Sequence, residues 1–248
     1  MSGDSNQPAL NPALDRAAAR AAFARAGRLH APDFLQDGDA RRLSDALAGC
    51  GAWERTLYES DRTLDVPPAE IAAMSPEGQV ALHRAVYAQA RAGFGYLFET
   101  VRISNLVRAG RPVDPAFEAV FRFVNGAPFL DVVAEMTGGA RGVYADCQAT
   151  RYLPGFFLNA HDDRADGKDR LYAYVLNLTP EWRADWGGVL MFLDAKGNVA
   201  EGFTPAFNAL NLFAVPQKHA VSLVAPFAAG ARLSFTGWIR SRAPDGAD

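Results

Sequence analysis

The chain has little cysteine, no long apolar run and no strong excess of charge. Cys50 and Cys147 are the only two cysteines in 248 residues, and neither has a paired spacing such as C-x-x-C. A disulfide framework or a thiolate zinc site is therefore not expected, and a reducing, cytoplasmic location is favoured. The polar, acidic start of the chain lacks the apolar core of a secretory signal, and no run is long enough to span a bilayer.

The charge balance also narrows the choice of partners. A net charge of -3 and a pI near 5.8 give no electrostatic reason to bind nucleic acid or an anionic membrane, so neither is expected as a partner. With 49% hydrophobic and 21% charged residues, the composition is that of a globular protein that can bury a substantial core.

The first half of the chain carries the end signals and spacing of helices. The stretch from Ser75 to Gly93 begins with Ser-Pro, which suits the start of a helix, and it ends on glycine. Leu43 and Leu47 lie one helical turn apart, which predicts an apolar helix face. Helices are expected over 14–27, 37–49, 75–93, 112–126 and 127–139, with a short strand over 52–58.

After Gly139 the pattern changes to short apolar or alternating runs, separated by Gly, Pro, Asn and Asp. Runs of this kind are typical of the strands of a sandwich or barrel. They occupy 142–155, 170–178, 187–193, 208–215, 218–224 and 232–240. The sequence therefore predicts an α+β fold: a mainly helical part, 1–139, that packs on a double-stranded β-helix (jelly-roll) core, 140–242, as one integrated domain.

A histidine and an aspartate stand just ahead of one of these runs, in the segment NAHDDRADGKDRLYAYVLNL. His161 and Asp163 are two residues apart, so in an extended segment their side chains point to the same face and can bind one metal ion. The pair alone is a weak signal, because about 0.3 H-x-D pairs are expected by chance. On this pair alone, a turn with solvated charges is the better interpretation.

Two further positions change this balance. His219 is the only other histidine after residue 139, and it opens an apolar run, where a histidine needs a partner. Arg232 begins the last apolar run with Ser234 on the same side, and a buried guanidinium needs an anion. A hydrogen-bonded core histidine and an internal ion pair would explain each one singly. Jointly, two histidines and an aspartate match the facial triad of a non-haem Fe(II) oxygenase, and Arg232 with Ser234 offers a dicarboxylate site.

Three segments resemble a known family: RYLPGFFLNAHDD, LTPEWRADWGG and KHAVSLV with ARLSFTGWIRS. They resemble the 2-oxoglutarate/Fe(II) dioxygenases of the prolyl 4-hydroxylase-like superfamily, most closely the ribosomal-protein prolyl hydroxylases and their bacterial relatives, over about residues 140–242. The resemblance implies that His161, Asp163 and His219 bind iron and that Arg232 binds the distal carboxylate of 2-oxoglutarate. It also implies Fe(II), 2-oxoglutarate and dioxygen as cofactors, with ascorbate a further candidate.

The resemblance extends to the cosubstrate pocket. Tyr152 matches a pocket tyrosine nine residues before the first iron ligand. Asn177 stands where related enzymes often carry a tyrosine that reaches 2-oxoglutarate. Either Asn177 itself, or Tyr172 or Tyr174 of the same strand, would complete the pocket. Trp238 and the other two tryptophans of this half are expected to be core or rim aromatics rather than a base-stacking platform.

By this resemblance the expected activity is hydroxylation of an unactivated C–H bond, on a prolyl residue of a protein or peptide. The partner would be the substrate protein, with ribosomal or translation-related proteins as candidates. One alternative is the same chemistry on a free amino acid or another small metabolite. A third hypothesis, from a different class, is a non-catalytic jelly-roll binding module. Stimulation of succinate release by a peptide or by a metabolite separates the first two, and the absence of iron-dependent turnover would support the third.

Overall fold

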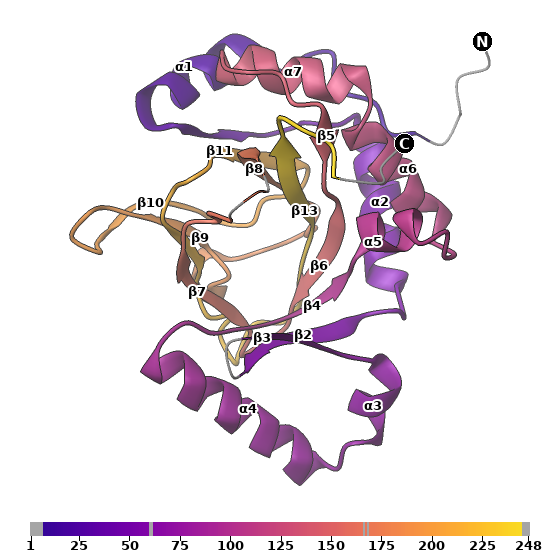
Figure 1. Ribbon diagram of the computed structural model, residues 1–248, viewed down its shortest axis with the longest axis vertical. Helices are drawn as coiled ribbons and strands as arrows, with labels where there is room; N and C mark the ends of the chain where they lie inside the picture. Colours follow the sequence, from indigo (N-terminus) through magenta and orange to yellow (C-terminus); the bar gives the residue numbers. More distant parts are fainter. Residues whose placement is uncertain (1–6, 60–61, 166, 168, 245–248) are drawn as a thin grey trace.

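One antiparallel sheet curls into a nearly closed barrel in the computed structural model, which describes residues 7–59, 62–165, 167 and 169–244 (Figure 1). The strands run around the barrel in the order β1-β11-β8-β13-β6-β4-β7-β12-β9-β10, with β2, β3 and β5 attached beside this path. Their bounds are β1 Arg28–Ala31, β2 Glu54–Glu59, β3 Arg62–Val66, β4 Tyr96–Val101, β5 Tyr144–Ala145, β6 Gln148–Tyr152, β7 Phe157–His161, β8 Arg170–Asn177, β9 Leu190–Leu193, β10 Val199–Phe203, β11 Ala209–Ala214, β12 His219–Val221 and β13 Arg232–Arg240. The expected fold class, helices with a double-stranded β-helix core, is confirmed.

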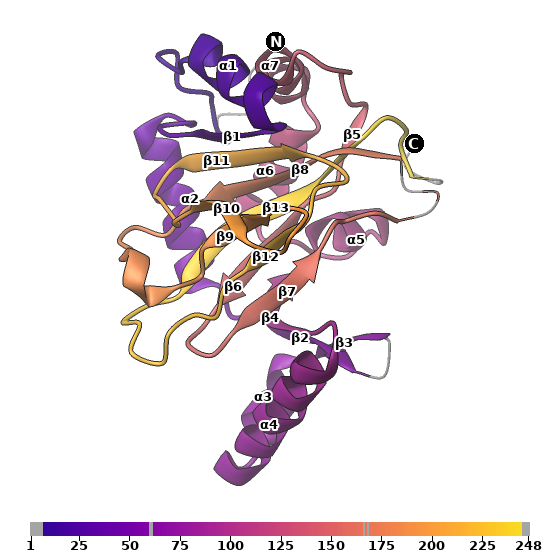
Figure 2. The same ribbon diagram turned by 90° about the vertical axis from the view of Figure 1, so that its left-hand side faces the viewer.

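Helices cover the barrel on several sides and leave the face of β9 and β10 open (Figure 1). They are α1 Arg16–Ala26, α2 Asp37–Gly49, α3 Pro68–Ala73, α4 Pro76–Ala92, α5 Ile103–Arg108, α6 Pro115–Val124 and α7 Ala127–Thr137, with a 3-10 turn at Ala184–Trp186. Figure 2 shows α3 and α4 projecting from the end of the barrel where β2 and β3 lie. No helix of the described ranges is both long and apolar enough to cross a membrane.

The five helices expected from the sequence are all present. α2 has the predicted bounds, and α4 begins after Ser75, whose side chain accepts a hydrogen bond from the backbone of Gly78. α1 starts two residues later than the expected position 14, because Asp15 caps it, its side chain accepting a hydrogen bond from the backbone N–H of Ala18. The secretory-signal argument rests partly on residues 1–6, which lie outside the described residues.

Several short elements were not expected from the sequence: β1, β3, β4, β7 and β10, and the helices α3 and α5. Each has six residues or fewer, too short to show a period clearly. β4 matters most, because it pairs with β6 on one side and with β7 on the other. Residues 1–139 thus supply strands of the barrel wall as well as helices, and the boundary at residue 139 stays a prediction.

Two apolar clusters lie on opposite faces of the sheet. The outer cluster joins the sheet to the helices, and the inner cluster fills part of the barrel. Alternation along β8 shows the division: Tyr174 and Leu176 belong to the outer cluster, while Ala173 and Val175 belong to the inner one. Because both faces are covered, β8 reads as a nearly continuous apolar run rather than as an alternating one.

Candidate metal centre and cosubstrate pocket

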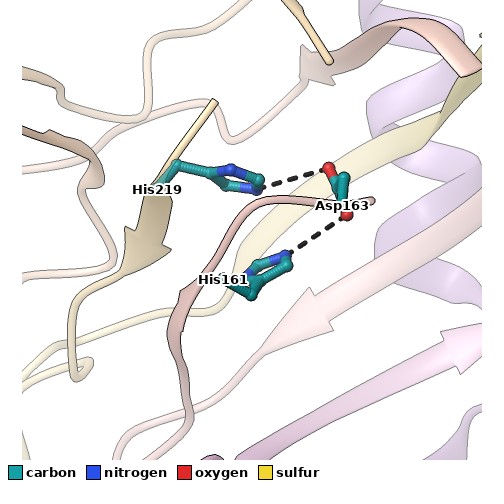
Figure 3. Close-up of side chains that lie close together, drawn as sticks. All are labelled: His161, Asp163 and His219. Carbon is teal, nitrogen blue, oxygen red and sulfur yellow. Dashed lines mark ion pairs between the residues drawn. The ribbon is translucent and has the colours of Figure 1, made fainter. Parts of the chain in front are cut away.

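Three side chains that could bind a metal ion converge inside the barrel (Figure 3). The candidate ligand atoms of His161, Asp163 and His219 all lie within 4.8 Å of one another. His161 Nε2 is 3.3 Å from Asp163 Oδ1, and His219 Nε2 is 3.5 Å from Asp163 Oδ2. The convergence that the sequence predicts for these residues is therefore present in the fold.

Strand pairing brings the two histidines together. β12 lies antiparallel to β7, and His219 is in register with His161, so their ring centroids are 4.2 Å apart. The approach of Asp163 differs from the expectation of one extended segment. β7 ends at His161, and Asp163 has a left-handed backbone with φ of 61°. A turn after the strand, rather than strand alternation, thus directs the carboxylate towards the imidazoles.

Backbone carbonyls fix the orientation of both imidazole rings. His161 Nδ1 is 2.9 Å from the carbonyl oxygen of Asn159, and His219 Nδ1 is 2.8 Å from that of Gln217. Since a carbonyl can only accept, each Nδ1 carries a proton, and in the neutral ring Nε2 keeps its lone pair. This tautomer is the one that binds a metal through Nε2.

The protonation states also suit a divalent cation. Burial, and then the charge of His161, lowers the pKa of His219 to about 4, so this ring is neutral at physiological pH. Burial alone would lower the pKa of His161, but its hydrogen bond to Asp163 and the charge of that carboxylate raise it overall. Burial would raise the pKa of Asp163, yet its contacts with the histidines and Trp238 lower it. The cluster therefore offers one carboxylate and one neutral imidazole, and Asp163 favours a proton on His161 Nε2 that a bound cation would displace.

The cluster lines a cavity of about 380 Å³ within the barrel. Tyr152 of β6 and Arg232 of β13 lie on the same cavity wall, with the Arg232 guanidinium 5.1 Å from the centre of the Tyr152 ring. A cation over an aromatic face gains some electrostatic stabilisation. The two residues predicted for the cosubstrate thus share one cavity with the three predicted for iron.

Arg232 is a buried cation without a carboxylate partner among the described residues. Only 2% of it is exposed, and its Nε has no hydrogen-bond partner there. Burial lowers the pKa of Arg232, and only the nearby Tyr152 acts in the opposite direction. The internal ion pair that would explain this arginine structurally is therefore not found, and an anionic ligand would satisfy it.

Ser234 and Asn177 lie next to each other on paired strands but differ in their partners. The Ser234 hydroxyl is 2.8 Å from that of Thr150, a residue on the cavity wall. Asn177 is fully buried, and neither its Oδ1 nor its Nδ2 has a hydrogen-bond partner among the described residues. Neither Ser234 nor Asn177 is among the residues that line the cavity.

The two tyrosines considered in place of Asn177 have other contacts. Tyr172 donates to the carbonyl of Ala140 and packs edge-on against Phe23 of α1. Tyr174 donates to the carbonyl of Asp146 at 2.9 Å. Both hydroxyls are thus used by the protein itself, and of the three candidates on this strand Asn177 alone keeps unpaired polar atoms.

An aromatic strip on the cavity wall was missed at the level of sequence. Phe94, Tyr96 and Phe98 follow one another at ring distances of 5.6 and 5.4 Å, and Phe98 stacks on Tyr152 at 5.5 Å. Phe94 lies 5.8 Å from the ring of His161, so the strip connects the metal cluster with the cosubstrate pocket. The signal was available, because an aromatic at every second residue indicates one face of a strand.

The tryptophans Trp182 and Trp238, expected in the core or at the rim, lie in the turn before β9 and on the cavity wall, respectively. Trp238 lies on the cavity wall, where Arg170 packs over its ring. Trp182 is half-buried and donates from Nε1 to the carbonyl of Gly187, in the turn that precedes β9. A Cβ at Gly187 would lie 2.0 Å from the carbonyl oxygen of Leu223, so this close approach requires glycine.

A jelly-roll barrel with two histidines, one carboxylate and a buried unpaired arginine in its cavity is typical of non-haem Fe(II) oxygenases. Comparison with known families agrees: residues 147–240 match the 2OG-Fe(II) oxygenase superfamily. This segment is therefore similar to that superfamily, and the match implies Fe(II), 2-oxoglutarate and dioxygen as cofactors. No curated protein is significantly similar to the chain in sequence.

Solved structures share the fold. A prolyl-4-hydroxylase from Pseudomonas putida is 21% identical, with a TM-score of 0.58, covering 92% of this chain and 99% of its own. A 2OG-Fe(II) oxygenase-family oxidoreductase from Burkholderia pseudomallei is 17% identical, with a TM-score of 0.59, covering 94% and 93%. A Trichoplax adhaerens prolyl hydroxylase, solved with a hypoxia inducible factor peptide fragment, is 14% identical, with a TM-score of 0.58, covering 91% and 89%.

Proposed function

We propose that the protein is an Fe(II)- and 2-oxoglutarate-dependent dioxygenase that hydroxylates a prolyl residue of a protein or peptide. His161, Asp163 and His219 hold the iron, and Arg232 holds the distal carboxylate of 2-oxoglutarate. One observation carries the proposal: the three donor atoms and an unpaired buried guanidinium face a single cavity. A metal cluster alone, or an arginine alone, would have a structural explanation.

When bound, Fe(II) and 2-oxoglutarate supply an oxidation in which dioxygen is consumed, 2-oxoglutarate becomes succinate and carbon dioxide, and C–H becomes C–OH. The chain supplies placement. Arg232 neutralises the far end of the cosubstrate, and Tyr152 packs against that guanidinium. The aromatic strip Phe94, Tyr96 and Phe98 walls the cavity with apolar surface, which excludes water from the reacting groups.

Asn177 is the remaining candidate beside the cosubstrate pocket in this proposal: it does not line the cavity itself, but Ala173 and Val175 on the same face of β8 do. Its amide is fully buried and unpaired, and a carboxylate accepting from Nδ2 would satisfy it. Replacing Asn177 by Leu removes this donor and should weaken 2-oxoglutarate about 5- to 10-fold, which corresponds to one hydrogen bond of about 1–1.5 kcal/mol. Equilibrium titration of the metal-loaded protein measures the change. An unchanged dissociation constant would remove Asn177 from the pocket and leave Arg232 in it.

Support for a prolyl substrate comes from the aromatic strip beside the metal cluster and from the prolyl hydroxylases among the structures of similar fold. An aromatic face can pack against the apolar ring of proline. The neighbour from Trichoplax adhaerens binds a peptide fragment, which agrees with a polypeptide substrate. The suggested link to ribosomal proteins rests on the sequence resemblance alone.

Succinate release under controlled iron supply tests the proposal. Purified protein with Fe(II), 2-oxoglutarate and dioxygen is offered proline-containing peptide libraries or free amino acids, and products are searched for a mass increase of one oxygen atom. Stimulation by peptides supports the proposed substrate class, and stimulation only by free amino acids supports the small-metabolite alternative. Absence of iron-dependent turnover, in wild type as in Asp163→Ala, would favour a non-catalytic binding module.

A further inference from the structure

Arg170 contacts the segment that carries one of the candidate metal ligands. It is the first residue of β8, seven residues after Asp163, and its Nη1 donates to the backbone carbonyl of Asp163 at 2.8 Å. The same nitrogen is 4.0 Å from Asp163 Oδ1. Arg170 thus contacts both the backbone and the carboxylate of Asp163.

A tryptophan holds Arg170 in this position. The Arg170 guanidinium lies 3.6 Å from the centre of the Trp238 ring, which comes from the neighbouring strand β13. Both Arg170 and Trp238 line the cavity, so Arg170 approaches Asp163 from the cavity wall.

The position of Asp163 makes such support necessary. β7 ends two residues earlier at His161, so no ladder of backbone hydrogen bonds extends to Asp163. The backbone of Asp163 is in the left-handed region, with φ of 61°, which costs an aspartate some strain. The hydrogen bond from Arg170 therefore stabilises a conformation that the strand itself does not enforce.

Among the described residues Arg170 forms no other ion pair. Asp146, whose charge also acts on Arg170, is bound by Arg240 at 2.6 Å. Arg170 Nε is buried and has no partner among the described residues, and only 10% of the side chain is exposed. The burial of this charge is offset chiefly by the Trp238 ring and by Asp163, so its arrangement is specific to the ligand-bearing turn.

We propose that Arg170, seated on Trp238, is a positioning residue that holds Asp163 in the orientation needed to bind the metal. This inference rests on the proposed function, because it assumes that His161, Asp163 and His219 form a metal site. It makes a prediction of definite sign. A nearby positive charge by itself repels a cation, so electrostatics alone predicts tighter metal binding once Arg170 is removed, whereas loss of positioning predicts weaker binding.

The test is a titration of the metal-free protein with Co²⁺, in which binding is monitored by calorimetry and by visible absorption. Arg170→Met removes the charge and the donor but keeps an apolar stem on the Trp238 ring. We expect its dissociation constant for Co²⁺ to rise about 10- to 100-fold, the usual effect of losing a residue that orients a ligand. The absorption of bound Co²⁺ at saturation should shift as well, because the ligand geometry changes.

Arg240→Met is the matched control. Arg240 is the register partner of Arg170 on β13, but it binds Asp146 instead of Asp163. Its Co²⁺ affinity and spectrum should match wild type, even if the variant is less stable. At saturating Co²⁺, both variants should bind 2-oxoglutarate within about threefold of wild type, since the Arg232 pocket is untouched.

The possible outcomes separate the two proposals. If wild type binds Co²⁺ and folded Arg170→Met binds it equally well or more tightly, the positioning role is wrong and the metal site stands. If wild type binds no Co²⁺, the proposed function fails and this inference fails with it. Should Arg170→Met not fold, Trp238→Leu, which removes the surface under the guanidinium, must weaken Co²⁺ in the same direction, and unchanged affinity would overturn the inference.

Discussion

In the absence of 2-oxoglutarate, the protein with Arg232 should be less stable than a variant with an apolar side chain at the same position, because the buried guanidinium has no carboxylate partner among the described residues. Arg232→Met is the perturbation, because methionine fills a similar volume without charge. Replacing a buried charge by an apolar residue is often neutral or stabilising by about 1–4 kcal/mol. In a chain of 248 residues each kcal/mol corresponds to about 2–4 °C in melting temperature. We therefore expect the ligand-free variant to melt at or above the wild-type temperature.

Binding should change in the opposite direction. Removing one partner of a buried charge pair costs about 2–5 kcal/mol, so 2-oxoglutarate should bind Arg232→Met about 30-fold to several thousand-fold more weakly. At 100 times the wild-type dissociation constant, 2-oxoglutarate stabilises wild type by about 2.7 kcal/mol. At the same concentration a 30-fold weaker site gains only about 0.9 kcal/mol. The thermal shift on adding 2-oxoglutarate should therefore shrink to a third or less.

Differential scanning calorimetry of the metal-loaded protein, with and without 2-oxoglutarate, measures both effects. Arg55→Met serves as control, because Arg55 is also buried but forms an ion pair with Glu99 at 2.9 Å. Glu99 keeps its contact with Arg151 at 2.6 Å, so the loss of Arg55 should destabilise the protein by about 1–3 kcal/mol and leave the 2-oxoglutarate shift intact. The reasoning is refuted if Arg232→Met loses as much stability as Arg55→Met, or if it keeps the wild-type shift.

Three further predictions concern the metal site, a buried thiol and a turn. Asp163→Ala should abolish metal-dependent succinate release and weaken Co²⁺ binding at least 100-fold, since a ligand is lost. Asp162→Ala, at a half-buried neighbour outside the cluster, should change neither. Cys147, whose pKa burial raises to about 12, should resist alkylation at pH 8 in the folded protein and react after denaturation, as mass spectrometry would show. Gly187→Ala should lower the free energy of unfolding, measured in urea, by about 2–5 kcal/mol, because the positive φ and the close contact with a carbonyl both exclude a Cβ. The control is Gly197→Ala, where φ is 85° but nothing lies within reach of a Cβ, and it should cost only about 1–2 kcal/mol.

The sequence predicts best those elements whose ends carry their own signals. α4 begins at the proline of a Ser-Pro pair and ends before a glycine, and α2 has a regular apolar face, so both could be placed from residue types alone. β4 is harder to place, because five of its six residues are buried and apolar residues occur on both faces, so that only the aromatics at every second position mark it as a strand. β1 and β3 are recognisable only through the strands with which they pair.

The candidate site divides in the same way. His161, Asp163, His219 and Arg232 could be proposed from sequence because rare residue types recur at defined places in apolar runs. The turn that aims Asp163 and the position of Arg170 could not. Both depend on how β7, β8 and β13 pack together, and residue type alone does not show whether an arginine is exposed or packed on a tryptophan ring.

The placement of β4 means that part of the cavity wall and the candidate metal ligands come from different parts of the sequence. This strand lies between β6, which carries Tyr152, and β7, which carries His161, yet it precedes them in the sequence by about fifty and sixty residues. Its aromatic side chains border the space for the reacting molecule without supplying any of the candidate iron ligands. Exchange of β4 between related proteins should therefore change which substrate fits the cavity and leave the candidate iron ligands and Arg232 in place. A segment of residues 147–240 moved into another protein would lack β4.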